Sequence, residues 1–276
     1  MSAEFSWKTT DGINIYGVDW RCELPCAVVG IVHGLGEHVH RYEHVVNYLH
    51  AHKIAVIGYD RRGHGRSEGK KGHTVSYSAL IDEVGQLAVE AEERYPQLPF
   101  FLYGHSMGGN LVLSYILRRH PTLQGAIVSA PHIRLAFQPP AAMVMLGRMM
   151  KRVFPGFTQN NGLAQEQLSR DPAVIEAYRN DPYVHDRLTA VTGVGMLESA
   201  AVLDKYTGAF PVPLLLMHGS DDGITSAAAS EEFAGRVTGD VTFKKWDALY
   251  HEIHNEPEQE EVLKTVVGWI NTQLKS

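Results

Sequence analysis

Short apolar runs alternate with longer segments of helical periodicity along most of the chain. The apolar runs are rich in Val, Ile, Leu and aromatic residues, which is typical of strands buried on both faces. The predicted strand and helix pairs are, in chain order, 27–33 with 41–52, 54–59 with 77–95, and 100–103 with 107–120. Such alternation requires crossover connections and predicts a mostly parallel sheet.

The same pattern continues toward the C-terminus, and an antiparallel hairpin precedes it. Further elements are predicted as strands at 125–130, 212–218 and 241–246 and as an amphipathic helix at 259–274. At the other end of the chain, two half-alternating segments, 4–9 and 13–21, flank the turn signal at 10–12. The predicted class is therefore α/β, with a mostly parallel sheet, an N-terminal antiparallel hairpin and helices on both faces.

The alternation stops between Pro131 and Phe210. Proline and glycine breaks separate several predicted helices in this stretch. We therefore predict a core made of residues 1–132 and 211–276 and a helical cap inserted at 133–210.

The first predicted cap helix is rich in methionine. Residues 141–150 hold four of the eight methionines of the chain. Soft, unbranched thioether side chains suit a surface that accepts varied acyl chains; the alternative is a helix that packs its apolar face on the core. The nearby Arg148, Lys151 and Arg152 suggest a further hypothesis, transient contact of the cap with a membrane surface.

Composition excludes several classes of protein. A formal net charge of −6 gives no basic footprint, so nucleic acid is not expected as a partner. Cys22 and Cys26 stand alone, without the second pair or the histidines that a zinc site needs, and are expected to be reduced thiols. Neither a signal peptide nor a membrane-spanning run is recognisable, so a cytoplasmic enzyme, peripheral to membranes at most, is expected.

Ser106 is the strongest candidate for chemistry. It stands at the centre of Gly104-His105-Ser106-Met107-Gly108, between a predicted strand and a predicted helix. A strand that turns abruptly into a helix leaves the corner residue strained and its side chain exposed, and glycines two positions away on each side prevent collisions. The pentapeptide therefore predicts a nucleophile; a turn with a solvated serine is the alternative.

A serine nucleophile needs a base and an acid, and two downstream loops offer them. Catalytic groups gather at the carboxyl ends of parallel strands. One predicted strand runs into Asp221 and Asp222, and the last runs into His251 and His254. The order Ser, Asp, His is that of an α/β-hydrolase triad, but chemistry alone does not choose between the two carboxylates or the two imidazoles.

Three other interpretations are weaker. The Gly34-Leu35-Gly36 loop begins like a dinucleotide-binding loop, but Val39 stands where the third glycine belongs. The imidazoles of His251 and His254 are three residues apart, which fails the spacing of a zinc-protease helix. The Arg- and Gly-rich segment 60–67 could hold a phosphate or form a structural turn.

Taken together, the motifs resemble those of α/β-hydrolases of the monoacylglycerol lipase and lysophospholipase group, also described as serine aminopeptidase-like hydrolases. The matching stretches are His33 to His38 with Arg41-Tyr42, Asp60 to Ser67, Gly104 to Gly109, His218 to Asp222, and Tyr250 to Glu252. The resemblance extends over nearly the whole chain and implies the α/β-hydrolase fold with a cap.

The resemblance also implies roles for particular residues. It favours Asp222 over Asp221 as the triad acid, with Asp221 as a loop residue that could cap the helix beginning near residue 226. It favours His251 over His254 as the base, and for residues 60–67 it favours a structural turn beneath the active site over a phosphate site. The backbone N–H groups of Leu35 and Met107 would then form the oxyanion hole.

The leading hypothesis is hydrolysis of a carboxylic ester through an acyl-enzyme, with no metal or organic cofactor. By resemblance, the substrate is a small lipid ester, a monoacylglycerol or lysophospholipid, whose acyl chain lies against the cap. The alternatives are a broad-specificity short-chain carboxylesterase and a non-catalytic lipid-binding relative that keeps the fold.

Overall fold

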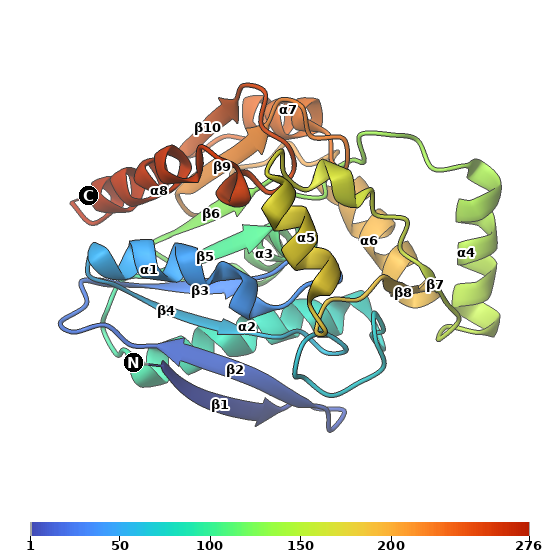
Figure 1. Cartoon of the computed structure of the whole chain (residues 1–276), viewed down its shortest axis with the longest axis horizontal. Coiled ribbons are helices and arrows are strands. Elements are labelled where there is room, and N and C mark those ends of the chain that lie inside the picture. The colour runs from blue at the N-terminus through green and yellow to red at the C-terminus, as the bar shows by residue number, and fades with distance from the viewer. Residues whose placement is uncertain (1, 276) are drawn as a thin grey trace.

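The computed structural model describes residues 2–275 and is built on one eight-stranded sheet (Figure 1). In spatial order its strands are β1 (Ser2–Lys8), β2 (Asn14–Trp20), β4 (Ile54–Tyr59), β3 (Ala27–Val32), β5 (Phe100–His105), β6 (Gly125–Ser129), β9 (Leu214–Gly219) and β10 (Val241–Trp246). β1 and β2 form an antiparallel hairpin, β2 pairs antiparallel with β4, and all other neighbours are parallel. The predicted sheet and hairpin are confirmed.

Helices cover both faces of this sheet, as the apolar periodicity predicts. α1 (Glu43–Ala51) and α8 (Gln259–Gln273) lie on one face, and α2 (Tyr77–Arg94), α3 (Met107–Arg119) and α7 (Ala227–Arg236) on the other. Two short 3-10 turns, Val39–Tyr42 and Ile253–Asn255, precede α1 and α8. The helix expected from residue 41 therefore begins at Glu43, because the tighter turn takes up the preceding residues.

The segment between β6 and β9 leaves the sheet and returns to it. Its elements are α4 (Ala141–Val153), β7 (Thr158–Asn160), the 3-10 turn Gln165–Gln167, α5 (Pro172–Asn180), β8 (Arg187–Thr189) and α6 (Ala190–Leu203). β7 and β8 pair antiparallel as a small second sheet. This pair was not predicted from the sequence, because strands of three mostly polar residues carry no alternation to detect.

α6 is held against the core by a buried polar network. Asn110 on α3 accepts hydrogen bonds through Oδ1 from Ser199 of α6 at 2.9 Å and from Tyr77 of α2 at 2.7 Å. Its side-chain amide donates to the carbonyl of His132, just after β6, at 2.7 Å. A fully satisfied network of this kind fixes the position of the elements it joins.

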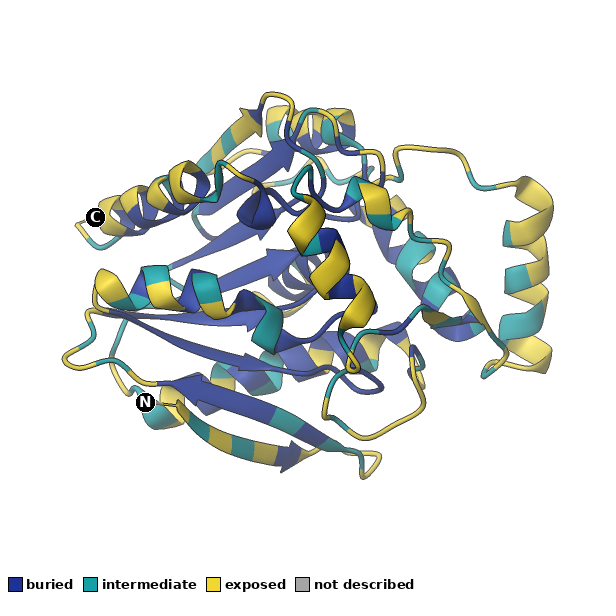
Figure 2. Cartoon of the chain, in the orientation of Figure 1, coloured by how far each residue is buried: buried dark blue, intermediate teal, exposed yellow. Residues whose placement is uncertain are grey.

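α4 lies outside the body of the molecule, at the right edge of Figure 1, and none of its residues is buried (Figure 2). Met145 is 71% exposed, and its neighbours Leu146 and Met149 are each more than half exposed. The alternative interpretation, that this methionine-rich helix packs its apolar face on the core, is therefore wrong. Its inner side instead faces α6, where Gly147 approaches Val194.

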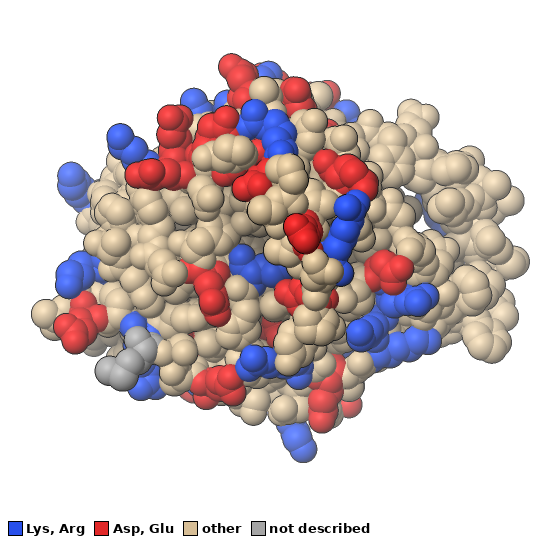
Figure 3. All heavy atoms as spheres, viewed as in Figure 1, with Lys and Arg blue, Asp and Glu red and all other residues tan. Residues whose placement is uncertain are grey.

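The surface carries interspersed charges. On the face shown in Figure 3, basic and acidic side chains alternate over the core, while the part over α4 is mostly uncharged. Among residues 2–275, none of the helices combines the length and the apolar character that a bilayer-spanning segment needs.

Candidate active site

Ser106 occupies the sharp corner between β5 and α3. Its backbone has φ 55° and ψ −117°, a conformation that non-glycine residues rarely adopt, and the side chain is 8% exposed. The flanking glycines are sterically required: a Cβ on Gly108 would lie 2.0 Å from the carbonyl oxygen of Val32, and one on Gly104 would lie 2.7 Å from that of Gly108. The strained corner is the geometry that the pentapeptide predicts.

The backbone around Ser106 is held on both sides. Its N–H donates to the carbonyl of Ser129 on β6 at 3.0 Å, and its own carbonyl accepts from the N–H groups of Asn110 and His132, each at 3.0 Å. Such anchoring is what allows a strained backbone conformation to persist.

Asp222 and His251 meet at the carboxyl ends of β9 and β10. Nδ1 of His251 lies 2.7 Å from Oδ2 of Asp222, and both side chains are buried. The other carboxylate oxygen, Oδ1, accepts backbone N–H bonds from Ile224 at 2.7 Å and Thr225 at 2.9 Å. Nε2 of His218, near the end of β9, lies 3.0 Å from Oδ2 of Asp222. The carboxylate is therefore fixed in orientation by four neighbours.

The charges of this pair shift both pKa values. Burial by itself would raise the pKa of Asp222, but the His251 charge and hydrogen bonds from His218 and His251 hold the pKa well below its ordinary value. Burial would lower the pKa of His251, but the neighbouring Asp222 carboxylate raises the pKa above its ordinary 6.5. The pair can thus hold a positive imidazolium beside a fixed negative charge.

Asp221 and His254, the other candidates for the acid and the base, lie in different environments. Asp221 is exposed and accepts a hydrogen bond from Ser220. It does not cap the following helix; Ser226 does, because its Oγ accepts from the N–H of Ala229 at 3.2 Å. His254 is buried and stacks on Tyr42 with ring centroids 4.9 Å apart, and burial lowers its pKa to about 3.

The loops after β5 and β10 bring the surroundings of Ser106 and of His251 close to each other. The ring of His105, the residue before Ser106, lies 4.7 Å from that of His251. Oγ1 of Thr225 lies 3.3 Å from Nδ1 of His251, and Thr225 lines the same cavity as Ser106. The sheet thus brings three widely separated segments to one place.

The loop after β3 approaches Ser106 from the other side. A Cβ on Gly34 would lie 2.7 Å from Oε1 of Glu37 and 3.3 Å from Cδ2 of His105, so a side chain at this position would crowd the loop beside Ser106. The backbone N–H groups of Leu35 and Met107 donate to no other group within residues 2–275. Met107 is also the first residue of α3, where the helix dipole favours negative charge.

A buried ion-pair network joins this loop to the His251 loop. Glu37 accepts the N–H of Gly34 at 2.5 Å, and its carboxylate pairs with Arg41 at 2.6 Å. The guanidinium of Arg41 also forms two hydrogen bonds, each 2.8 Å long, with the carboxylate of Glu252, which follows His251. Glu37, Arg41 and Glu252 belong to the matching motifs, but no role was predicted for them. Arg41 and Glu252 are 211 positions apart, and the sequence pattern does not show that they pair.

The turn at 60–67 is structural, as predicted, since its polar groups are used internally. Asp60 accepts the N–H of Val39 through Oδ1 and that of Arg66 through Oδ2, each at 2.8 Å. The side chains of Arg61 and Arg62 point inward and are almost fully buried. Neither guanidinium is available to an outside phosphate.

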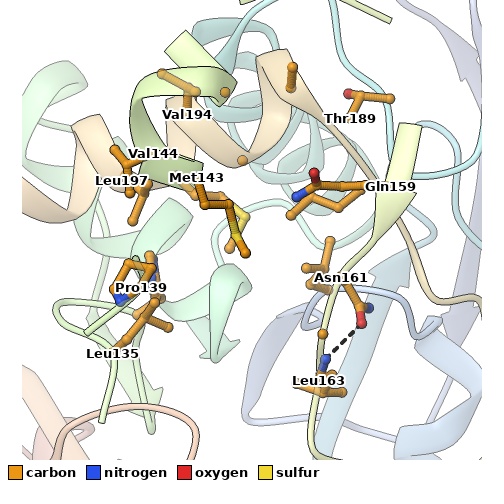
Figure 4. Close-up of a pocket in the computed structure, with 18 of the residues that line it drawn as sticks. Leu135, Pro139, Met143, Val144, Gln159, Asn161, Leu163, Thr189, Val194 and Leu197 are labelled. Carbon is orange, nitrogen blue, oxygen red and sulfur yellow. Dashed lines mark hydrogen bonds between the residues drawn. The ribbon is translucent and has the colours of Figure 1, made fainter. Parts of the chain in front are cut away.

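A cavity of about 240 Å³ opens beside Ser106 (Figure 4). Its lining is mostly apolar and comes from α4, α6 and the loops after β3, β6 and β9; it includes Leu35, Met143, Val144, Val194, Leu197 and Ile224. Asn161, just after β7, also faces it. Its side-chain oxygen accepts the N–H of Leu163 at 2.9 Å, whereas its buried Nδ2 has no partner in the described part of the chain.

Comparison with known proteins identifies the protein family. The family described as Serine aminopeptidase, S33 matches residues 23–258. The chain belongs to this family of α/β-hydrolases.

Two relatives and one solved structure show how far along the chain the similarity extends. The chain is 34% identical to the monoacylglycerol lipase of Mycolicibacterium smegmatis, over 99% of this chain and 98% of that protein. It is 37% identical to an uncharacterized abhydrolase domain-containing protein of Dictyostelium discoideum, but spans only 27% of that longer protein. The solved structure of Paleococcus ferrophilus monoacylglycerol lipase superposes with a TM-score of 0.84 at 30% identity, covering 99% of this chain and 98% of that one. The chain is thus similar over its full length to monoacylglycerol lipases.

Proposed function

We propose that the protein is a serine hydrolase of lipid carboxylic esters, with Ser106 as nucleophile, His251 as base and Asp222 as the acid that orients the base. The observation that carries the proposal is the 2.7 Å contact of His251 with Asp222 beside a strained serine at a mostly apolar cavity. The full-length similarity to monoacylglycerol lipases supports the same chemistry.

The reaction follows from these positions. His251 takes the hydroxyl proton as Ser106 attacks the ester carbonyl, and the N–H groups of Leu35 and Met107 receive the negative charge that develops on its oxygen. The imidazolium then gives the proton to the leaving alcohol, which leaves an acyl-enzyme. Water, deprotonated by the same imidazole, attacks this ester and releases the fatty acid.

In this proposal, residues 133–210 act as the cap that binds the acyl chain. The support is the position of α4, which presents the side chains of Met143, Val144 and Met150 to the cavity and buries none of them in the core. Flexible thioether side chains adapt to acyl chains of different length.

A panel of esters tests the substrate class. We expect kcat/KM to be highest for monooleoylglycerol and lower for p-nitrophenyl palmitate, lysophosphatidylcholine and p-nitrophenyl butyrate. Activity confined to the butyrate ester would make the protein a short-chain carboxylesterase, and a preference for lysophosphatidylcholine would make it a lysophospholipase.

Asn161 is expected to contribute to selectivity for the alcohol part of the substrate. A buried donor without a partner is unfavourable, so a ligand oxygen that satisfies it, such as a glycerol hydroxyl, binds better. Asn161→Asp keeps the oxygen that accepts from Leu163 but loses the donor. We expect kcat/KM to fall about 3- to 10-fold for monooleoylglycerol relative to methyl oleate, which carries no hydroxyl. An unchanged ratio of the two would show that Asn161 does not contact the alcohol.

The exposed side of α4 supports a second proposal, transient contact with membrane surfaces. Met145 and Val153 are 71% and 69% exposed and lie outside the cavity lining. The double substitution Met145→Glu and Val153→Glu is expected to reduce co-sedimentation with anionic liposomes several-fold. Turnover of water-soluble p-nitrophenyl butyrate should stay the same. Equal co-sedimentation of both proteins would exclude α4 as the contact.

A further inference from the structure

Arg61 is fully buried, and its guanidinium hydrogen-bonds to a carbonyl and not to a carboxylate of residues 2–275. The two acidic side chains whose charges act on it, Glu83 and Glu37, are paired with other arginines, Arg62 and Arg41 respectively. Arg61 forms no ion pair within residues 2–275, and its Nε has no hydrogen-bond partner there. A buried charge without a counter-charge is strongly unfavourable, so its retention needs a reason.

The guanidinium instead contacts the carbonyl of the Gly34–Leu35 peptide group and the side chain of Met107. Its Nη2 donates to the carbonyl oxygen of Gly34 at 2.5 Å, and its Nη1 lies 2.9 Å from Sδ of Met107. His33 adds a second donor, since its Nδ1 lies 2.8 Å from the same carbonyl. The other ring nitrogen, Nε2, accepts the backbone N–H of Arg61 at 3.0 Å, so the ring proton is on Nδ1.

The Gly34 carbonyl and the Leu35 N–H belong to one peptide group. Hydrogen bonds to a carbonyl oxygen draw electron density away from the nitrogen of that peptide, so its N–H becomes a stronger donor. A charged donor polarises the peptide more than a neutral donor does. The positive charge is also next to this peptide, so it favours the negative charge that would develop at the Leu35 N–H.

We infer that Arg61 is a positioning residue that stabilises the oxyanion by orienting and polarising the Gly34–Leu35 peptide. This inference rests on the proposed function, because it requires an acyl-transfer step with an oxyanion at Leu35. The side chain never touches substrate. Burying its charge lowers the stability of the fold. The compensating effect is a lower activation free energy, because the charge stabilises the oxyanion that exists only in the transition state.

Burial lowers the pKa of Arg61 below its ordinary value, which shows that the surroundings disfavour the charge. The guanidinium nevertheless remains protonated, because its ordinary pKa lies far above neutrality. A neutral, unbranched side chain of similar length should therefore be tolerated at least as well by the fold.

Arg61→Met tests the inference. We expect kcat for monooleoylglycerol to fall about 10- to 100-fold, less than the loss of a direct oxyanion donor, with KM within about 2-fold. The Ki of an alkyl trifluoromethyl ketone, which forms a tetrahedral oxyanion on the serine, should rise by the same factor. Binding of a non-hydrolysable 1-O-alkylglycerol should not change. The melting temperature should be equal to or higher than that of the unaltered protein.

Arg62→Met is the matched control. Arg62 is the next residue and is also buried, but it pairs with Glu83 and, at 2.7 Å, with Asp11. Removing it leaves the Glu83 carboxylate buried and unpaired, so the melting temperature should fall. The kcat of the folded protein and the trifluoromethyl ketone Ki should stay within about 2-fold of the original values, since no oxyanion contact is lost.

Two results would overturn the inference: an unchanged kcat in Arg61→Met, or a loss of kcat that disappears at a lower temperature where the variant is fully folded. Failure of the proposed function is a separate result, because the unaltered protein would then hydrolyse none of the esters and would not react with the ketone.

Discussion

Ser106→Ala is expected to reduce ester hydrolysis by roughly 10⁴- to 10⁶-fold, because removing a nucleophile leaves only binding and the oxyanion hole to accelerate the reaction. The substitution removes one oxygen from a side chain that forms no hydrogen bond within residues 2–275, so the fold should be unaffected. Turnover of monooleoylglycerol and labelling by a fluorophosphonate should both disappear, while the melting temperature stays close to that of the unaltered protein.

Ser129→Ala is the control for this experiment. Ser129 lies on the neighbouring strand β6 and is buried, and its side chain interacts with that of Tyr103 rather than with Asp222 or His251. Its loss should leave labelling and turnover intact. Labelling that persists in Ser106→Ala would mean that another residue is the nucleophile, and an unaltered protein that binds lipid but is never labelled would be a non-catalytic relative.

The central sheet could be predicted because its signal is local. β4 at 54–59 and β10 at 241–246 have the predicted bounds, since each is a short run with a charged residue directly before it and directly after it. The strand order could not be derived from periodicity alone, but strand–helix alternation restricts it strongly. Because parallel strands end at one edge, the positions of Asp222 and His251 after β9 and β10 follow from the same pattern.

The supporting contacts could not be predicted, because they depend on partners far apart in the chain. Arg41 and Glu252 look like ordinary solvated charges in the sequence, yet they are buried against each other. Arg61 likewise gives no signal beyond lying in an Arg- and Gly-rich turn. Arg62 is also buried, and what distinguishes Arg61 from it in the described chain is the lack of a counter-charge. Alternation also gives no information on which side of α4 faces α6.

Asp222→Asn is expected to lower kcat by about 10⁴-fold while leaving KM nearly unchanged. In the unaltered protein the carboxylate accepts from Nδ1 of His251, so Nε2 is free to take the serine proton. The asparagine oxygen is expected to keep the backbone N–H bonds of Ile224 and Thr225, which turns its amide N–H₂ toward His251. Nδ1 must then act as the acceptor, and the proton moves to Nε2, where it blocks the reaction.

The pH profile separates this explanation from simple misfolding. The base acts only when neutral, so kcat/KM of the unaltered protein should fall as the pH drops through the pKa of His251, which Asp222 raises above 6.5. Without the carboxylate, burial is the dominant influence and lowers the pKa, so the acid limb of the residual activity should move to lower pH. Asp221→Asn, which changes an exposed neighbour, should leave both kcat and the acid limb unchanged. If the limb stays in place in Asp222→Asn, or moves in Asp221→Asn instead, the carboxylate that controls His251 is not Asp222.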